Sequence, residues 1–209
     1  MTTEAVTVAI LAKAPRPGFA KTRLIPRLGA AGAAALQDWL LRRTVATAVA
    51  AQLGPVTLWG APDGADPAFA AVAGGSVTVH DQPAGDLGIR LLAAVAAGPT
   101  LLLGTDCPAL TPAILRRAAG ALAHHDAVAI PAEDGGYVLL GLHRADPSLF
   151  TGIAWSTAQV MAQTRQRLQQ LGWRWLELPA LWDVDRPDDL GRLLAAWPAT
   201  ADFACPGPP

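Results

Sequence analysis

The sequence is poor in charge and in cysteine, and each shortage excludes a class of function. Only 16% of the 209 residues are charged, and sixteen cations against seventeen anions leave a net charge of −1. A protein without an excess of basic residues lacks the field that draws nucleic acid, so we expect no nucleic-acid partner. Two cysteines, Cys107 and Cys205, provide neither a disulfide framework nor a metal cluster.

Long apolar runs are also missing. The longest candidate, residues 91–104, contains Pro99 and is shorter than the roughly 18 to 20 apolar residues that span a bilayer. The N-terminus shows no charged segment followed by an apolar core, so we expect no export signal, no membrane partner and a cytoplasmic location. Apolar residues still make up 52% of the chain, which is enough for a large core.

The charges that are present are unevenly distributed. Lysine occurs only at Lys13 and Lys21, and residues 5–37 contain five cations and no acid. At the other end of the chain, four aspartates fall within seven residues, namely Asp183, Asp185, Asp188 and Asp189. The chain is therefore neutral overall and strongly polarised locally.

Apolar runs of strand length alternate with helical segments along the whole chain. Strands are predicted at residues 7–12, 56–59, 77–80, 100–103, 127–130, 137–142 and 174–178. Helices are predicted at residues 31–53, 87–97, from 112, from 156 or 157 to 171, and 187–196. This alternation predicts one α/β domain over residues 1–197, with a mostly parallel sheet between layers of helices. Residues 198–209 are expected to form a flexible tail.

A basic loop, residues 13–23, follows the first predicted strand. It contains Lys13, Arg16, Lys21 and Arg23 and no acid. Ligands of open α/β sheets bind at the carboxyl ends of strands, and a loop that leads into a helix favours anions. The loop is therefore predicted to bind phosphates, although it matches neither the Walker A pattern nor G-x-G-x-x-G. The alternative is a solvated basic loop at the edge of the sheet.

Asp106 follows the buried strand at residues 100–103. A carboxylate at such a position is costly unless it is paired or binds a metal, and its hard oxygens suit Mg²⁺ or Mn²⁺ arriving with phosphates. A contact to a ribose is a second role for Asp106. The alternative is a helix cap, but Thr111 before Pro112 already fills that position.

The acidic loop, residues 183–189, offers a second candidate for a cation site. Asp183 and Asp185 alternate in an extended segment, so both side chains point the same way and could share one cation. Asp188 and Asp189 are assigned to the first turn of a helix, where acids suit the helix dipole.

Residues 133–137, Glu133-Asp134-Gly135-Gly136-Tyr137, form a third candidate segment. Two glycines after two acids permit unusual backbone angles and a close approach to a ligand, although the same residues are typical of a hairpin turn. We predict that Asp134 or Glu133 is the base that activates an acceptor, with Gly135, Gly136 and Tyr137 on the acceptor side.

Two weaker candidates complete the set. Gly85, Asp86 and Arg90 place a glycine-flanked acid near an arginine that could reach a nucleotide. Trp155, Ser156 and Thr157 place an aromatic residue before a helix, on the acceptor side, although helix capping alone explains Ser156.

The ordered motifs resemble a known family. They are Lys-Ala-Pro-x-Pro-Gly-x-x-Lys-Thr-Arg, Gly-Asp-Leu-Gly-x-Arg, Gly-Thr-Asp-x-Pro, Asp-Gly-Gly-Tyr, Trp-Ser-Thr and Asp-Val-Asp. Together they resemble the bacterial arsenosugar-biosynthesis-type glycosyltransferases, also called selenodomain-associated transferases, of the nucleotide-diphospho-sugar transferase superfamily. The first loop is also similar to that of 2-phospho-lactate guanylyltransferase.

This resemblance implies a GT-A fold and a transferase that binds a nucleotide or nucleotide sugar and a small-molecule acceptor. By similarity, Lys13, Lys21 and Arg23 hold phosphates, while Asp106 and Asp185 hold a divalent cation, Mg²⁺ or Mn²⁺. Asp106 stands in Thr-Asp-Cys rather than in the D-x-D of many glycosyltransferases, and Arg186 replaces a common Thr.

Several alternatives remain open at this stage. Glycosyl transfer is the first expectation and nucleotidyl transfer with release of pyrophosphate the second. A nucleotide-binding protein without turnover is a third, although it would need no second acidic cluster. Seven tryptophans would suit a homodimer surface, and core packing explains them equally well.

Overall fold

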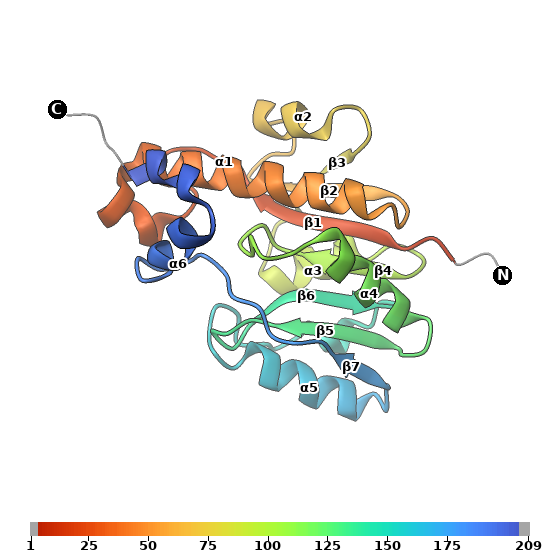
Figure 1. Cartoon of the computed structure of the whole chain (residues 1–209). Coiled ribbons are helices and arrows are strands. Elements are labelled where there is room, and N and C mark those ends of the chain that lie inside the picture. Colours follow the sequence, from red (N-terminus) through yellow and green to blue (C-terminus); the bar gives the residue numbers. More distant parts are fainter. Residues whose placement is uncertain (1–3, 205–209) are drawn as a thin grey trace.

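A seven-stranded sheet forms the centre of the computed structural model, which describes residues 4–204 (Figure 1). The strands are β1 (Thr7–Lys13), β2 (Val56–Ala61), β3 (Thr78–Asp81), β4 (Thr100–Leu103), β5 (Ala127–Pro131), β6 (Tyr137–Leu142) and β7 (Trp175–Glu177). Their order is β3-β2-β1-β4-β6-β5-β7, and only β6 runs antiparallel to its neighbours among these strands. The predicted mostly parallel α/β fold is confirmed.

Helices cover both faces of this sheet. They are α1 (Ile25–Ala51), α2 (Pro67–Ala73), α3 (Leu87–Ala94), α4 (Pro112–Leu122), α5 (Val160–Gln170) and α6 (Asp189–Ala196). Three short 3-10 helices join them, namely η1 (Thr22–Leu24), η2 (Pro147–Leu149) and η3 (Pro198–Ala204). No helix in residues 4–204 has both the length and the apolar character to cross a membrane.

The core is divided between the two faces because successive side chains of a strand point to opposite sides. On one face, Ile10 and its neighbours pack against α1, α2 and α4. On the other face, Leu11 and its neighbours pack against α3 and α5. Strands β1, β4 and β5 are buried almost throughout, which explains their continuous apolar sequences.

The direction of β6 places one more loop at the edge where the parallel strands end. β6 is antiparallel to β5, and its first residue, Tyr137, pairs with Pro131 at the end of β5. The turn between them therefore lies at the same edge as the loops that follow β1 and β4, on the left of Figure 1. Candidate loops that are distant in sequence consequently converge.

Several helix boundaries differ from the sequence predictions. α1 begins at Ile25 rather than near residue 31, with an interruption at Gly29, whose φ of 69° is not helical. α5 begins at Val160 with Gln159 at its N-cap, and Ser156 lies before it in a left-handed conformation with φ of 64°. The interpretation of Ser156 as a helix cap was therefore wrong.

Two short segments were missed or shortened by the sequence analysis. α2 was not predicted, although Asp66 caps it by accepting a bond from the Ala68 amide and Pro67 occupies its first turn. α6 begins at Asp189, two residues later than predicted, with Asp188 at its N-cap. Thr111 does cap α4, as expected, by accepting a bond from the Ile114 amide.

The C-terminal segment differs from the expected flexible tail over part of its length. Residues 198–204 form η3, which packs against α1 and α6. Phe203 contacts the apolar cluster of α1 and α6, and its carbonyl lies so near Gly32 that a Cβ there would approach it to 2.3 Å. Residues 205–209, including Cys205, lie outside the described residues.

Gly141 in β6 tests the packing of the central sheet. A Cβ at this position would lie 2.5 Å from Val128 Cγ1 and 2.8 Å from Leu101 Cδ2. We expect Gly141→Ala to lower the free energy of unfolding by about 1 to 3 kcal/mol through overpacking.

Urea denaturation measures this loss, and Gly120→Ala is the matched control. Nothing lies within 4 Å of a Cβ built on Gly120, an exposed residue of α4. That substitution should raise stability by about 0.5 to 1 kcal/mol through helix propensity. Equal effects of the two substitutions would contradict the packing described here.

Candidate functional site

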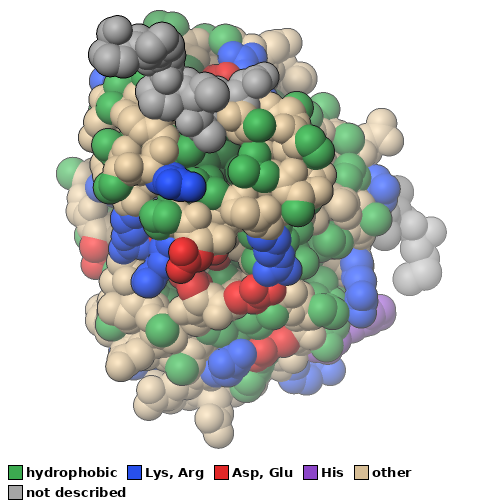
Figure 2. Space-filling view, turned by 60° about the vertical axis from the view of Figure 1, so that its left-hand side comes forward, with side chains coloured by type: hydrophobic (Ala, Val, Ile, Leu, Met, Phe, Trp, Pro, Cys, Tyr) green, Lys and Arg blue, Asp and Glu red, His purple; other side chains and the backbone are tan. Residues whose placement is uncertain are grey.

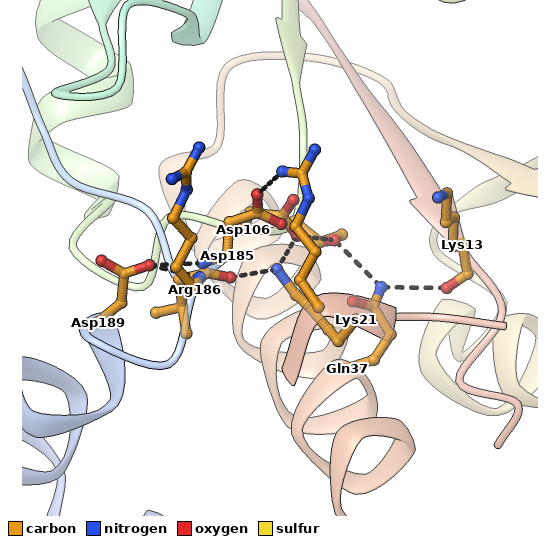
Figure 3. Close-up of polar contacts among 10 residues, drawn as sticks. Lys13, Lys21, Gln37, Asp106, Asp185, Arg186 and Asp189 are labelled. Atoms are coloured by element: carbon orange, nitrogen blue, oxygen red, sulfur yellow. Dashed lines mark hydrogen bonds and ion pairs between the residues drawn. The ribbon is translucent and has the colours of Figure 1, made fainter. Parts of the chain in front are cut away.

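Two ion pairs connect the basic loop to the acidic segments at the carboxyl edge of the sheet. Lys21 Nζ lies 2.6 Å from Asp106 Oδ1 and donates to the Val184 carbonyl over 2.5 Å (Figure 3). Arg23 pairs with Asp185 in the same region. Three segments that are far apart in the sequence, residues 13–23, 104–108 and 183–189, are therefore held together.

The conformation of Lys21 commits its side chain to these contacts. Its side chain is only 3% exposed, and its backbone is left-handed with φ of 50°. This conformation costs a non-glycine residue about 1 to 2 kcal/mol. A buried ammonium also needs a compensating charge, which Asp106 supplies. Lys21 thus lies in the predicted site, but facing a carboxylate and a carbonyl in the interior.

A buried glutamine of α1 extends this network. Gln37 Nε2 donates to the Lys13 carbonyl over 3.0 Å and to Thr105 Oγ1 over 3.2 Å. Thr105 Oγ1 in turn lies 3.3 Å from Asp106 Oδ1, to which it donates. Gln37 fixes the end of β1 to the loop after β4. The sequence analysis missed it, and its only signal is an amide among the apolar residues of a helix.

Three carboxylates lie near one another at this edge. Asp183 is half-buried, and burial raises its pKa to about 6, with further contributions from the negative charges of Asp134 and Asp106. The nearby Lys21 ammonium acts in the opposite direction. Figure 2 shows acidic side chains grouped on this face, with basic side chains around them.

The residues at this edge fit a divalent cation that is completed by other ligands. No group of three or more His, Cys, Asp or Glu side chains in residues 4–204 could hold a metal. Asp106 and Asp183 provide two carboxylates, and Asp106 is 47% exposed. Mg²⁺ commonly takes one or two carboxylates together with substrate phosphates and water. The donor set therefore suits a cation that arrives with phosphates.

Asp185 and Asp183 have different partners in the structure. Its carboxylate faces Arg23, whereas Asp183 is the acid whose charge interacts with Asp106. Asp189 folds the loop by accepting bonds from the Asp185 amide at 2.9 Å and the Arg186 amide at 2.6 Å. The sequence pattern could not separate Asp183 from Asp185.

Two exposed cations border this edge. Lys13 and Arg186 are exposed and make no ion pair within residues 4–204. The Lys13 side chain extends away from the bond that its carbonyl makes with Gln37, and the Arg186 guanidinium extends from the acidic loop (Figure 3). These two groups are able to meet an incoming anion.

Residues 133–137 form the β5–β6 turn and pack closely against the segment before α5. Asp134 Oδ1 accepts a bond of 2.9 Å from the Gly136 amide. Gly135 has φ of 94°, and a Cβ there would lie 2.3 Å from the Ala158 carbonyl oxygen. The Gly135 carbonyl accepts a bond from the Met161 amide at 2.9 Å. The glycine is thus required by both the turn and the close approach.

The turn is also connected to α6. Arg192 Nη1 lies 2.8 Å from Glu133 Oε2, and the Arg192 guanidinium stacks on Trp182 at 4.6 Å. Glu133 is therefore already paired, whereas the exposed Asp134 makes no ion pair within the described part of the chain. Arg192 was not among the predicted site residues.

Two polar atoms of residues that pack against the α3 and α5 cluster are buried without a partner in the described part of the chain. Tyr137 Oη and Trp155 Nε1 have no hydrogen bond within residues 4–204. Burial raises the pKa of Tyr137. The indole Nε1 of Trp155 lies beside α3, 3.1 Å from where a Cβ on Gly88 would be. Buried donors usually have partners, and these two atoms are exceptions within the described residues.

Ser156 and Thr157 lie in the exposed turn before α5. Thr157 Oγ1 donates to the Ala154 carbonyl over 2.7 Å and accepts from the Gln159 amide over 3.2 Å. These bonds shape the turn that carries Trp155.

The remaining predicted residues have structural partners. Arg16 pairs with Asp66 at 2.6 Å, so it stabilises the start of α2. Asp86 caps α3 by accepting a bond from the Ile89 amide at 3.0 Å. Both side chains lie outside the Lys21–Asp106 network.

Arg90 and Gly85 are joined by a hydrogen bond near the carboxyl ends of β1 and β2. Arg90 Nε donates to the Gly85 carbonyl over 3.2 Å, and Arg90 Nη1 lies 3.4 Å from Gln82 Oε1. Gln82 Nε2 donates to the carbonyls of Ala12 at 3.1 Å and Trp59 at 2.8 Å. Gln82, which the sequence analysis did not select, therefore connects these residues to the ends of β1 and β2.

Cys107 gives a test of burial beside Asp106. It is 4% exposed, as expected for a core residue, and burial raises the pKa of its thiol to about 11. At pH 8 such a thiol is ionised about once in a thousand molecules. We expect alkylation by iodoacetamide at pH 8 to be at least a hundredfold slower in the folded protein than in 8 M urea.

Mass spectrometry of a Cys205→Ser variant measures this rate on Cys107 alone. A model thiol at the same pH serves as the reference for reagent activity. Equal rates in the folded and unfolded protein would show that Cys107 is accessible.

Comparisons with known proteins agree with this architecture. A protein of Desulfovibrio desulfuricans G20, assigned to the nucleotide-diphospho-sugar transferases, is 27% identical and superposes with a TM-score of 0.84 over 95% of this chain and 93% of that one. A nucleotidyl transferase of Methanothermobacter is 16% identical, with a TM-score of 0.62 over 94% of this chain and 99% of that one.

A third similar structure is glucosyl-3-phosphoglycerate synthase from Mycobacterium tuberculosis, in complex with Mn²⁺, UDP and glucosyl-3-phosphoglycerate. It is 13% identical, with a TM-score of 0.54 over 98% of this chain and 81% of that one. At the identities of the last two proteins, the likeness shows the fold alone. Among curated proteins, none matches the chain.

A family model matches residues 44–157, more than half of the chain. The matched segment contains Asp106 and the β5–β6 turn, and it excludes the basic and acidic loops. The chain therefore belongs to the family described as "uncharacterized protein conserved in bacteria (DUF2064)", built on the fold of the nucleotide-diphospho-sugar transferases.

Proposed function

We propose that this protein is a nucleotide-dependent transferase that moves a glycosyl group from a nucleotide-diphospho-sugar to a small-molecule acceptor. The observation that carries the proposal is the meeting of the basic loop with Asp106 and Asp183 at the carboxyl edge of the sheet. Cations and carboxylates combined at such an edge suit a nucleotide phosphate with its cation. The likeness to the Desulfovibrio protein over nearly the whole chain supports a sugar nucleotide as donor.

Lys13 and Arg186 are proposed as the residues that meet the donor phosphates. Both are exposed cations at the rim of the acidic cluster. Arg23 would join them by exchanging Asp185 for a phosphate, because its side chain is 55% exposed. Arg16 and Arg90 serve the scaffold of the loops instead.

The chemistry at this edge is electrostatic. Asp106 and Asp183 would hold a divalent cation, which would supply positive charge to the departing diphosphate. Lys13 and Arg186 stabilise the same developing charge, and a well-placed group of this kind lowers a barrier by about 3 to 4 kcal/mol. Asp134, exposed on the β5–β6 turn, is proposed to take the proton of the acceptor hydroxyl or other nucleophile.

The acceptor is proposed to bind at the carboxyl edge of the sheet, beside the exposed Asp134 of the β5–β6 turn. Tyr137 Oη and Trp155 Nε1, which are buried and make no hydrogen bond within residues 4–204, are proposed as donors to it. An acceptor with oxygen atoms, such as a hydroxyl or carboxyl compound, would satisfy them. Glu133, Gly135, Gly136, Ser156 and Thr157 would shape the surroundings.

Nucleotidyl transfer is the second candidate function. The observation that favours it is that Asp106 stands alone, with Gly104 and Pro108 rather than acids two positions away, so the D-x-D pattern of many glycosyltransferases is not present here. The same cations would then stabilise pyrophosphate while a substrate phosphate attacks the α-phosphorus of a nucleoside triphosphate.

A thermal unfolding panel separates the two candidates. The panel contains GTP, CTP, UTP and ATP beside UDP- and GDP-sugars, each with Mg²⁺, Mn²⁺ or EDTA. A ligand present at a hundred times its Kd adds about 2.7 kcal/mol to stability, which a melting curve resolves. We expect stabilisation by one sugar nucleotide that exceeds the effect of every triphosphate. A larger, metal-dependent shift with one triphosphate would favour nucleotidyl transfer, and no shift with any ligand would contradict both.

Asp134→Asn tests the proposed base. Asparagine keeps the oxygen that accepts from the Gly136 amide but loses the basicity, so the turn should remain folded. We expect turnover to fall about 100-fold or more while donor affinity stays within twofold. Steady-state kinetics and calorimetric titration of the donor measure the two effects.

The matched control is Asp38→Asn, which removes an exposed carboxylate of α1 that pairs with Arg42. It should leave turnover unchanged. Full turnover by Asp134→Asn would remove Asp134 from the mechanism.

A further inference from the structure

Lys21 differs from the other cations of the basic loop because it is enclosed. Its side chain is 3% exposed, whereas those of Arg16 and Arg23 are 48% and 55% exposed. Two contacts, to Asp106 Oδ1 at 2.6 Å and to the Val184 carbonyl at 2.5 Å, hold its ammonium from the interior side of the site. The ammonium is therefore almost closed to a phosphate in solution.

The Asp106 carboxyl group faces Lys21 on one side and solvent on the other. Oδ1 faces Lys21 Nζ and the Thr105 hydroxyl, while the carboxyl group as a whole is 47% exposed. A cation that approaches from solvent therefore meets a carboxylate whose charge is already compensated by a positive group on its inner side. Like charges at such short range repel, so the ammonium weakens the binding of any second cation at Asp106.

The other acids at this edge differ in whether a cation of the chain already pairs with them. The Asp185 carboxylate pairs with Arg23, and the Glu133 carboxylate pairs with Arg192. Asp183 and Asp134 are the acids of the cluster that make no ion pair within the described residues. A divalent cation thus finds Asp183 and a compensated Asp106, which is too few ligands for tight binding without further oxygens.

We propose that the Lys21 ammonium compensates the charge of Asp106 in the absence of a metal ion. The ammonium thereby keeps the affinity of the nucleotide-free protein for divalent cations low. The cation then binds together with the nucleotide, whose phosphates supply the missing oxygens. Lys21 is in this sense a positioning residue that sets the order of binding. The dependence on nucleotide rests on the proposed function, whereas the competition between Lys21 and the cation does not.

Binding of Mn²⁺, followed by the electron paramagnetic resonance signal of the free ion, tests the competition without any turnover. Lys21→Met removes the ammonium, and we expect it to bind Mn²⁺ at least tenfold more tightly than the wild type in the absence of nucleotide. Lys21→Gln should do the same while keeping a donor for the Val184 carbonyl, so it preserves the fold if the methionine variant does not. Lys21→Arg keeps the charge and should resemble the wild type.

Two controls identify the source of the effect. Arg42→Met removes a cation from the exposed surface of α1, where it pairs with Asp38, and should leave Mn²⁺ affinity unchanged. The double variant Lys21→Gln with Asp106→Asn should lose the gain of the single variant, because the uncompensated carboxylate is gone. Unchanged or weaker Mn²⁺ binding by folded Lys21→Met or Lys21→Gln would overturn the proposal.

The wild-type protein gives an independent test. Its affinity for Mn²⁺ should be weak alone and at least tenfold tighter in the presence of the nucleotide that stabilises it most in the thermal panel. Tight Mn²⁺ binding without nucleotide would overturn the proposal, and it would decide the matter even if neither neutral variant of Lys21 folds. If neutral variants gain Mn²⁺ affinity but no nucleotide binds, the competition stands and the proposed function fails.

Discussion

The ion pair between Lys21 and Asp106 is the interaction on which the arrangement of the site depends. It joins a loop near the N-terminus to the end of a central strand, and the second bond of Lys21 adds the backbone of the acidic loop. The buried Lys21 ammonium would be costly without this partner, whereas the half-exposed Asp106 also remains in contact with solvent. The left-handed backbone at Lys21 indicates that the contact outweighs a local conformational cost.

The sheet topology explains why these loops meet at all. Strands β1 and β4 are neighbours and parallel, so the basic loop and Asp106 leave the sheet side by side. The reversed β6 brings the Asp134 turn to the same edge, and α6 carries Arg192 back to it. Residues separated by more than 160 positions thus share one small region, as in the Arg23–Asp185 pair.

The sequence was sufficient for the fold and for the loops that converge at the carboxyl edge of the sheet, but not for the pairing of side chains between them. Apolar runs of strand length and helix caps such as Thr111 are local signals, and they located most elements within a few residues. The left-handed conformation of Ser156 and the packing of η3 on α1 and α6 through Phe203 depend on tertiary contacts, so no local pattern reveals them.

In the candidate site, too, the sequence selected residues but did not indicate how their side chains pair. Charge clustering was enough to select Lys21, Asp183 and Asp185, and the position after a buried strand selected Asp106. It could not indicate that Lys21 would be buried against Asp106, or that Asp185 rather than Asp183 would face Arg23. Gln37 and Arg192 were missed because a single amide or arginine on an amphipathic helix gives no distinctive pattern.

The outermost strands have a consequence for self-association. β3 has four residues and β7 has three, so each edge of the sheet offers few backbone groups to another chain. On β7, the Arg165–Glu177 ion pair adds charge to this edge. Short, charged edges are poor templates for strand addition, which protects a chain that is half apolar from edge-to-edge aggregation. If two copies of this chain associate, the short edge strands favour contact through helices rather than through a continuous sheet.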